Sequence, residues 1–426
     1  MKIEVLHQHF LESTGICTDT RNITSGCLFF ALTGENFNGN KFAQEALDNG
    51  ARKVIIDQIN YHKNTSETIL CSSSLRMLQR LATYHRKHLG VPVIALTGSN
   101  GKTTTKELIN VVLKQKFNTT ATKGNLNNHI GVPLTLLSMN EKTEVGIVEM
   151  GANHPKEIEG LCEIALPDYG YITNFGKAHL EGFGSVEGVV RAKTELYRYL
   201  YAHNKIVFVN GNDALQNLHT KDLVKVTFGN DQRDCYIQLK DATNTLKINF
   251  EGLAIQSNLI GLYNFHNIAA AIAIGNYFKV SSEKIKEAIE AYVPANNRSQ
   301  LVEKARNRII LDAYNANPTS MIAALENFAQ AEGNNKILFL GDMFELGTEA
   351  EIEHQNIVDF LEQNQIGQTY LIGNNFYKTV SSDANIVKFN TFEELKEVIE
   401  SDPPKDSYLL IKASRGMALE RILDLI

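Results

Sequence analysis

The sequence predicts an α/β protein of three domains. A central doubly wound, mostly parallel sheet with a phosphate loop follows a smaller N-terminal α/β domain and precedes a C-terminal Rossmann-like domain. The chain has 426 residues, too many for one core, since a domain usually has roughly 100–200 residues. From about residue 91 onward, short apolar runs alternate with amphipathic helical patterns, which is typical of parallel strands joined by helices. We expect domains at residues 1–89, 90–294 and 295–426.

Composition excludes several classes of protein. A net charge of −6 argues against a nucleic-acid-binding protein. No apolar stretch reaches the ~18 residues that cross a bilayer, and the polar N-terminus does not resemble a signal peptide. The 5 cysteines are scattered and form no Cys-x-x-Cys pair, as in proteins with reduced thiols. We therefore expect a cytoplasmic enzyme without membrane insertion or nucleic-acid partners.

The first domain is the least regular in its pattern. Residues 27–32 and 54–57 are typical of short strands, and residues 41–49 are typical of a helix between them. Residues 74–88 carry apolar side chains with a helical period and precede a Gly-Val-Pro break, which predicts a boundary helix and a linker.

The central domain has the clearest α/β signals. Residues 91–97 form a continuous apolar run, as a strand buried on both faces requires, and residues 103–116 form an amphipathic helix. Further buried strands are expected at residues 145–149, 169–173 and 206–209. Residues 228–259 alternate between polar and apolar side chains, which predicts an antiparallel part of the sheet.

The last domain repeats the alternation of strands and helices on a smaller scale. We expect strands at residues 308–311, 336–340, 369–372 and 408–411. We expect helices at residues 320–330, 349–363, 392–400 and 417–425. This pattern predicts a second doubly wound sheet.

A phosphate-binding loop connects the first central strand to its helix. The loop consists of Gly98, Ser99, Asn100, Gly101, Lys102, Thr103 and Thr104. Its glycines let backbone N–H groups converge on an anion, and the helix N-terminus adds positive charge. Lys102 would reach the β- and γ-phosphates of a nucleotide, and Thr103 would bind Mg²⁺. Leu96 stands where the usual pattern has its first glycine, and the alternative is a tight turn with a solvated lysine.

Glu149 ends the predicted strand 145–149, at the sheet edge where ligands bind in open α/β folds. A carboxylate beside a phosphate loop is a suitable Mg²⁺ ligand. The alternative is a solvated acid at the end of a strand.

The variant phosphate loop resembles that of the Mur ligases and their relatives, the folylpolyglutamate synthetases. Other motifs of the Mur ligases follow in the same order, at residues 125–133, 149–154, 178–184, 192–195, 312–318 and 341–347. Together they cover all three domains. The resemblance implies an ATP-dependent amide ligase (EC 6.3.2) whose domains bind the UDP substrate, bind ATP and complete the ligase site. It is strongest with the ligase that joins D-alanyl-D-alanine to UDP-N-acetylmuramoyl-tripeptide through an acyl phosphate, giving the pentapeptide precursor of peptidoglycan.

The resemblance also assigns ATP and two Mg²⁺ ions as cofactors. It implies that Thr103, Glu149, His179 and a carbamylated Lys193 bind the metals. A carbamate would turn the Lys193 cation into an oxygen ligand, whereas the residues alone favour a solvated lysine opening a helix at 193–201. For His179, in a glycine-rich loop, the residues alone favour an ordinary hydrogen-bonded histidine.

Further contacts to ATP follow from the resemblance. Asn267 would bind the adenine edge, Asp312 the ribose, and Arg298 the phosphates after domain closure. From the residues alone, Asn264 and Asn267 could instead cap a helix at 268–277, and Arg298 could be a linker residue without contacts.

The remaining assignments concern the other two substrates. For the UDP substrate, the resemblance implies contacts from Asp19, Thr20, Arg21, Asn36, Phe37, Asn125 and Asn128. For D-alanyl-D-alanine it implies contacts from Tyr314, Asn315 and Asn317. Alone, the segments around Asp19 and Asn36 are ordinary turns. We expect a monomer.

Two alternative functions stay open. One is another ligase of the superfamily, either MurE-like or a folylpolyglutamate synthetase, although the third domain has no Asp-Asn-Pro-Arg motif of the MurE kind. The other is an inert nucleotide-binding module, which the intact Lys102, Glu149 and Lys193 argue against. The sequence leaves open whether the third peptide residue is diaminopimelate or lysine.

Overall fold

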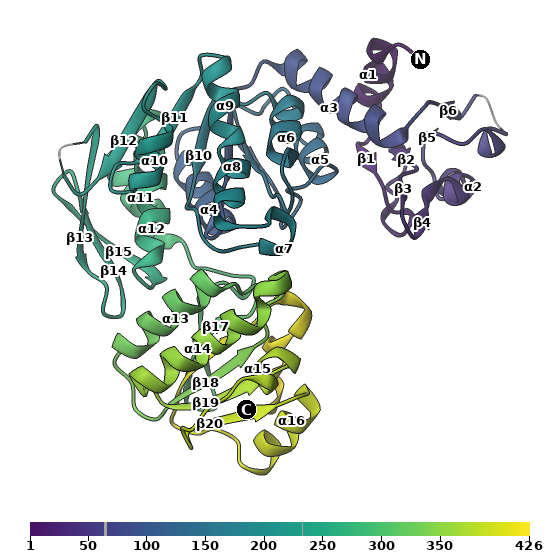
Figure 1. Ribbon diagram of the computed structural model, residues 1–426. Coiled ribbons are helices and arrows are strands. Elements are labelled where there is room, and N and C mark those ends of the chain that lie inside the picture. Colours follow the sequence, from purple (N-terminus) through teal and green to yellow (C-terminus); the bar gives the residue numbers. More distant parts are fainter. Residues whose placement is uncertain (64–65, 232) are drawn as a thin grey trace.

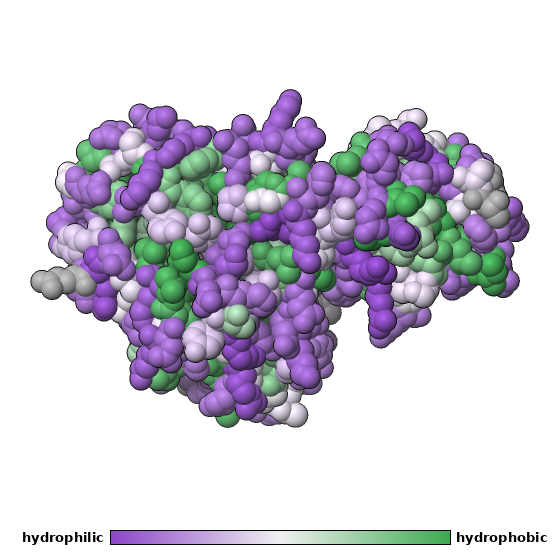
Figure 2. Space-filling model, turned by 90° about the horizontal axis from the view of Figure 1, so that it is seen from above, coloured by the Kyte–Doolittle hydropathy of each residue, from purple (hydrophilic) through white to green (hydrophobic). Residues whose placement is uncertain are grey.

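Three sheets of at least four strands each follow one another along the chain and divide it into three domains (Figure 1). The computed structural model describes residues 1–63, 66–231 and 233–426. Viewed from above, the N-terminal domain forms a lobe beside the rest of the molecule, and hydrophilic residues dominate the visible face (Figure 2). None of the helices in the described ranges is long and apolar enough to cross a membrane.

The N-terminal domain has a parallel sheet of order β1-β2-β5-β6. Its strands are β1 (Ile16–Cys17), β2 (Leu28–Phe30), β5 (Lys53–Ile56) and β6 (Thr68–Leu70), and β3 (Thr33–Gly34) pairs with β4 (Phe37–Asn38) in a hairpin. Its helices are α1 (Ile3–Leu11), α2 (Ala43–Asp48) and α3 (Ser74–Leu89). Both predicted strands and both predicted helices are confirmed, while α1, β1 and β6 were not predicted.

The central sheet has the order β15-β14-β13-β12-β11-β10-β7-β9-β8. Its strands are β7 (Val93–Thr97), β8 (Thr119–Ala121), β9 (Val145–Glu149), β10 (Tyr169–Ile172), β11 (Ile206–Asn210), β12 (Lys225–Gly229), β13 (Cys235–Asp241), β14 (Thr245–Phe250) and β15 (Leu253–Ile260). Strands from β8 to β13 pair in parallel, and β13, β14 and β15 pair antiparallel, which confirms the predicted antiparallel part.

Helices cover both faces of the central sheet, which explains the continuous apolar run in β7. Ile94 and Leu96 belong to the cluster that includes Leu108 of α4 (Lys102–Leu113) and Ile268 of α11 (Tyr263–Tyr277). Val93 and Ala95 belong to the cluster on the other face. The remaining helices are α5 (Gly131–Leu137), α6 (Glu157–Ala165), α7 (Leu180–Phe183), α8 (Val186–Lys193), α9 (Glu195–Ala202), α10 (Ala214–His219) and α12 (Ser282–Ala291).

Two expectations about helix starts are wrong. Lys193 does not open a helix at 193–201, because it is the last residue of α8 and a new helix, α9, begins at Glu195. Asn264 and Asn267 do not cap a helix at 268–277, because α11 begins earlier, at Tyr263, and contains both. The small residues that follow Asn267 are buried in one cluster with α4, and the helix that carries them begins one turn earlier than expected.

The C-terminal sheet has the order β16-β17-β21-β18-β19-β20, antiparallel only between β16 and β17. Its strands are β16 (Gln300–Lys304), β17 (Asn307–Asp312), β18 (Lys336–Gly341), β19 (Gln368–Ile372), β20 (Ile386–Phe389) and β21 (Tyr408–Lys412). Its α-helices are α13 (Pro318–Gln330), α14 (Ala350–Asn364), α15 (Asn374–Lys378) and α16 (Phe392–Ser401). The predicted α-helix at 417–425 is instead 3₁₀-helical, at Arg415–Met417 and Leu419–Leu425.

Helix α3 joins the N-terminal domain to the central domain. Arg86, near its end, donates to Asp168 Oδ2 at 2.6 Å and to the Leu166 carbonyl at 3.3 Å. Asp168 also accepts from the Val93 N–H and from Lys205 Nζ, at 3.0 and 2.7 Å. The half-buried carboxylate therefore fixes the last turn of α3 to the start of the central sheet. The domain boundaries near Leu89 and Pro294 stay predictions.

We expect Arg86→Ala to destabilise the protein by about 1–3 kcal/mol, because it removes charge-assisted bonds from a mostly buried guanidinium. Lys205→Ala is the matched control. It removes the other cation from the same carboxylate, but Lys205 is 37% exposed, so its loss should cost less than about 1 kcal/mol. Urea unfolding of both variants measures the difference, and equal losses would contradict this account of the junction.

Candidate functional site

A cavity of about 1340 Å³ lies between the central and C-terminal domains. Four of the strands whose carboxyl ends face it are β9, β11, β17 and β21, which end in Glu149, Asn210, Asp312 and Lys412. Carboxyl ends of parallel strands are where open α/β sheets bind ligands. Here the carboxyl ends of strands from both the central and the C-terminal sheet face the same cavity. A ligand in the cavity can therefore contact both domains.

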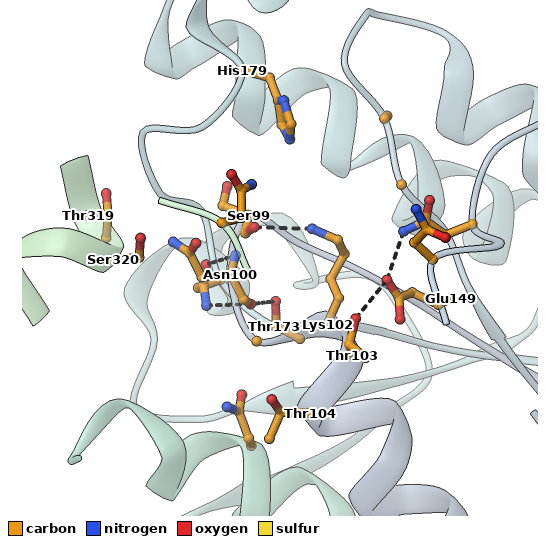
Figure 3. A pocket seen from close by; sticks show the side chains of 18 of the residues that line it. Ser99, Asn100, Lys102, Thr103, Thr104, Glu149, Thr173, His179, Thr319 and Ser320 are labelled. Carbon is orange, nitrogen blue, oxygen red and sulfur yellow. Dashed lines mark hydrogen bonds between the residues drawn. The ribbon is translucent and has the colours of Figure 1, made fainter. Parts of the chain in front are cut away.

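The phosphate loop forms part of the cavity wall and lies directly against β10 and α11. A Cβ atom on Gly98 would lie 1.9 Å from Thr173 Oγ1, and one on Gly101 would lie 2.6 Å from Asn267 Oδ1. Both glycines also have positive φ angles, 142° and 78°. A side chain at either position would push the loop away from its support. The predicted segment connects β7 to α4 as expected (Figure 3), and its binding of phosphate stays a prediction.

Lys102 points back across the loop (Figure 3). Its Nζ donates to the carbonyl groups of Gly98 and Ser99 at 2.8 and 3.1 Å. Burial lowers the pKa of Lys102, and Glu149 partly opposes that effect. The ammonium group therefore lies inside the loop, where phosphate oxygens can replace its carbonyl partners.

Glu149 lies beside Thr103 at the base of the cavity. Its Oε1 accepts from Thr103 Oγ1 at 3.2 Å and from Asn127 Nδ2 at 2.8 Å. Its Oε2 is buried and has no hydrogen-bond partner among the described residues, with Lys106 Nζ 3.8 Å away. A buried carboxylate oxygen without a donor, next to a hydroxyl group, fits the oxygen ligands of Mg²⁺.

The described residues include no group of three or more His, Cys, Asp or Glu side chains that could hold a metal by themselves. Magnesium in nucleotide sites usually takes one or two protein carboxylates and completes its shell with phosphates and water. Glu149 and Thr103 match that sparse arrangement, so the residues present fit a nucleotide-bound Mg²⁺.

His179 lies on the far side of the cavity, directly before the short helix α7. Part of the expected glycine-rich loop is therefore helical. His179 Nδ1 pairs with Glu345 Oε2 of the C-terminal domain, and this hydrogen bond lowers the pKa of Glu345. The contact joins two motifs of the sequence, 178–184 and 341–347, and leaves the Nε2 atom of His179 for other ligands.

Lys193 is fully buried, which corrects the picture of a solvated helix residue. Its Nζ donates to the Ala152 carbonyl at 3.2 Å and lies 5.2 Å from the centre of the Phe183 ring. Burial lowers the pKa of Lys193 well below its usual range, and the nearby Lys102 lowers it further. Burial therefore disfavours the charged form of Lys193 at this position.

The C-terminal wall of the cavity is built around Asp312. Its Oδ2 accepts from Lys412 Nζ at 2.6 Å, and its Oδ1 accepts from the Ser299 N–H at 3.1 Å. The Arg298 guanidinium lies 3.5 Å from the centre of the Tyr314 ring, and its Nε has no partner among the residues described. Arg298 is thus held by stacking and keeps hydrogen-bond donors for a ligand.

Asn267 lines the cavity but has partners of its own. Its Oδ1 accepts from Thr105 Oγ1 at 3.0 Å, and its Nδ2 donates to Asn264 Oδ1 at 2.8 Å. Each amide atom still has one free bonding position, so the adenine contact expected of Asn267 stays a prediction.

The cavity brings together most of the predicted site residues. Those that line it are Ser99, Asn100, Gly101, Lys102, Thr103, Thr104, Asn125, Asn128, Glu149, His179, Asn267, Arg298, Asp312, Tyr314 and Asn315. Gly98 and Lys193 lie next to it, hydrogen-bonded to the lining residues Lys102 and Ala152. Asn317 lies behind the lining, where its side chain bonds to Asn100 at 2.7 Å.

The predicted UDP-contacting residues of the N-terminal domain lie apart from this cavity. Asp19 begins the turn Thr20–Asn22 and bonds to the Arg21 guanidinium at 2.6 Å. Asn36 belongs to the hairpin of β3 and β4, and the Phe37 ring stacks on Phe42 with centres 5.5 Å apart. Their roles stay predictions.

Several cavity residues were not predicted as functional. They include Asn127, Asn174, Ser299 and Lys412, and Lys106 lies behind the lining with its Nζ 3.8 Å from Glu149 Oε2. Lys106 could have been found, because it follows Lys102 by four residues and shares its face of α4. The others depend on which strands become neighbours, which their local sequence does not indicate.

Comparisons with known proteins match all three parts of the chain to the same family. Three families match: Mur ligase family, catalytic domain, at residues 12–86; Mur ligase middle domain, at 96–275; and Mur ligase, glutamate ligase domain, at 297–415. The UDP-N-acetylmuramoyl-tripeptide–D-alanyl-D-alanine ligase of Bacillus subtilis is 35% identical over 96% of this chain and 92% of its own.

Solved structures agree as well. A crystal structure of MurF from Acinetobacter baumannii is 30% identical, covers 100% of this chain and 98% of its own, and has a TM-score of 0.88. MurF from Thermotoga maritima in complex with ADP is 26% identical over 98% of this chain and 97% of its own, with a TM-score of 0.85. The chain belongs to the Mur ligase family.

Proposed function

We propose that this protein ligates D-alanyl-D-alanine to UDP-N-acetylmuramoyl-tripeptide at the expense of ATP, giving the pentapeptide precursor of peptidoglycan. The observation that carries the proposal is the shared cavity, in which the phosphate loop and Glu149 of one sheet face Arg298 and Asp312 of another. Similarity over nearly the whole chain to relatives named for this reaction supports it.

The chemistry explains why such a cavity is needed. A carboxylate is a poor electrophile, so its oxygen first attacks the γ-phosphorus of ATP and displaces ADP. The amine of D-alanyl-D-alanine then attacks the acyl phosphate, and the tetrahedral intermediate expels phosphate. The protein contributes mainly positioning and charge neutralisation. Lys102 and Arg298 reach the phosphates from opposite domains, which requires the two domains to be close together.

In this proposal Glu149 and Thr103 would hold one Mg²⁺, and a carbamylated Lys193 would join Glu149 and His179 around a second. Bound Mg²⁺ would neutralise charge on the transferring phosphoryl group. Lys193 is suited to carbamylation because its buried amine has one carbonyl partner among the described residues and no carboxylate partner. The neutral amine adds to CO₂ and releases a proton, leaving an anionic oxygen ligand.

The UDP substrate and the dipeptide enter the cavity from different domains, and the UDP substrate extends beyond it. Asn125 and Asn128 bind the UDP substrate near the central domain, and Asp19, Thr20, Arg21, Asn36 and Phe37 bind its nucleotide end on the N-terminal domain. Tyr314, whose ring stacks on the Arg298 guanidinium, and Asn315 bind the dipeptide. Asn267 and Asp312 bind the adenosine. The protein acts as a monomer in the cytoplasm.

The reaction itself is the first test. Phosphate release from ATP should require both UDP-N-acetylmuramoyl-tripeptide and D-alanyl-D-alanine, and mass spectrometry should detect the pentapeptide product. Single amino acids should not replace the dipeptide. Ligation of diaminopimelate or lysine to the UDP-dipeptide precursor would instead favour a MurE-like enzyme, and phosphate release independent of both substrates would contradict the ligase reading.

Lys102→Ala should lower turnover by about 100-fold, because it removes a preorganised positive charge from the phosphate loop. The fold should persist, since Thr173 and Asn174 still hold the loop at Asn100. Lys114→Ala, at the exposed C-terminal end of α4, is the control and should leave turnover unchanged. Steady-state kinetics and circular dichroism measure both properties. Normal turnover in Lys102→Ala would remove the phosphate-loop assignment.

Lys193→Ala should lose most activity and regain part of it when a short carboxylic acid is added, because the acid supplies the missing oxygen ligand. In the unchanged protein, ¹³C-labelled CO₂ should give a carbamate signal in the NMR spectrum. Arg191→Ala, on the exposed face of the same helix, is the control and should keep both activity and signal. Full activity of Lys193→Ala at limiting Mg²⁺ would show that no carbamate ligand is needed.

A further inference from the structure

Asn100 of the phosphate loop has hydrogen-bond partners in two domains. Its backbone bonds to the central domain, and its side chain bonds to the C-terminal domain. Its N–H donates to Asn174 Oδ1 at 3.0 Å, and its carbonyl accepts from Thr173 Oγ1 and Asn174 Nδ2 at 2.6 and 3.0 Å. Its side chain pairs with Asn317 of the C-terminal domain. The central domain thus fixes the backbone of Asn100, and the C-terminal domain fixes its amide.

The pair with Asn317 is reciprocal. Asn317 Nδ2 donates to Asn100 Oδ1 at 2.7 Å, and Asn100 Nδ2 donates to Asn317 Oδ1 at 3.3 Å. Asn317 is 6% exposed, so water does not compete freely for these bonds.

The orientation of the Asn317 amide is set by its own helix. Asn317 is the N-cap of α13, and its Oδ1 accepts from the Ser320 N–H at 2.9 Å, while Ser320 Oγ accepts from the Asn317 N–H at 3.0 Å. Because the oxygen must face the helix end, the NH₂ group must face Asn100. The start of α13 therefore presents a fixed donor to the phosphate loop.

Nearby contacts also hold the central domain and the start of α13 together. The segment 174–179 lies beside the loop, where the Gly176 carbonyl accepts from Ser99 Oγ at 2.9 Å. From the other side, Thr319 Oγ1 accepts from the Lys177 N–H at 2.9 Å, and Lys177 Nζ pairs with Glu353 at 2.6 Å. Figure 3 shows Thr319 and Ser320 next to Asn100 and Ser99. The amide pair is thus formed only while α13 is seated on the central domain.

We propose that Asn317 is a positioning residue that completes the phosphate loop through Asn100 when the C-terminal domain is seated. The inference rests on the proposed function only in taking the loop to bind a nucleotide phosphate. It assigns Asn317 to the nucleotide site and not to the dipeptide, because both atoms of its amide are used and neither faces the cavity.

The test is Asn317→Ser in the full-length protein, measured by the binding of a fluorescent ADP with Mg²⁺. Serine caps helices about as well as asparagine but does not reach Asn100. We expect the Kd to rise about tenfold, which equals about 1.4 kcal/mol. In kinetics, the KM for ATP should rise while the KM for D-alanyl-D-alanine stays unchanged.

Two further variants separate the loss of the amide donor from the loss of a helix cap. Asn317→Asp keeps the cap but loses the donor, so it should weaken ADP binding at least as much as Asn317→Ser. Thr391→Ala removes a comparable cap from α16, elsewhere in the same domain, and should change the Kd by less than twofold. Thermal melts of all variants check that the fold is kept.

The results that would overturn the proposal are distinct from a failure of the proposed reaction. An unchanged Kd for ADP in Asn317→Ser overturns it, as does a rise confined to the KM for the dipeptide, which makes Asn317 a substrate contact. Loss in Asn317→Asp alone also overturns it, because an added charge then explains the effect. The binding measurement stands even if the ligation assay yields no pentapeptide.

Discussion

The close packing of the phosphate loop on β10 and α11 is the constraint on which the rest of the site depends. Gly98 and Gly101 have room for no side chain, since Thr173 and Asn267 occupy the space where a Cβ would lie. This packing aims the start of α4 at the cavity and places Lys102 and Thr103 on the same side as Glu149. A helix N-terminus in that position attracts phosphate before any side chain contributes.

Positive side chains converge on this cavity from several elements. Lys102 of α4 lines it, as do Arg298 and Lys412 of the C-terminal domain. Lys106 of α4 and Lys193 of α8 lie behind the lining, next to Glu149 and Ala152. Their mutual repulsion in a buried space is costly. Lys412 is neutralised by Asp312, Lys106 lies near Glu149, and burial lowers the pKa of Lys193, which disfavours its charged form. Lys102 and Arg298 keep the least compensated charge, which suits them to a polyphosphate.

Much of this arrangement could be predicted from the sequence, because the features that were predicted correctly have their signal within a short stretch of residues. Strand β7 reads as buried because both of its faces are covered, and the phosphate loop has its own residue pattern. The burial of Lys193 could not be predicted, because it depends on how α7 folds back over α8 and on Ala152, 41 residues away in sequence. The start of α11 was misplaced because its first turn carries asparagines, which favour caps when no packing opposes them.

The kind of contact between the domains also matters for a reaction that must open and close. A neutral amide bond contributes only about 0.5–1.5 kcal/mol, so the pair of Asn100 and Asn317 can form and break without locking the protein. A fully buried ion pair in its place would cost several kcal/mol to separate. The ion pair of Lys177 and Glu353 is half open to water on its lysine side, with 45% of that side chain exposed, so it too adds little. These two contacts are therefore specific in geometry and modest in energy, as repeated closure over a nucleotide would require.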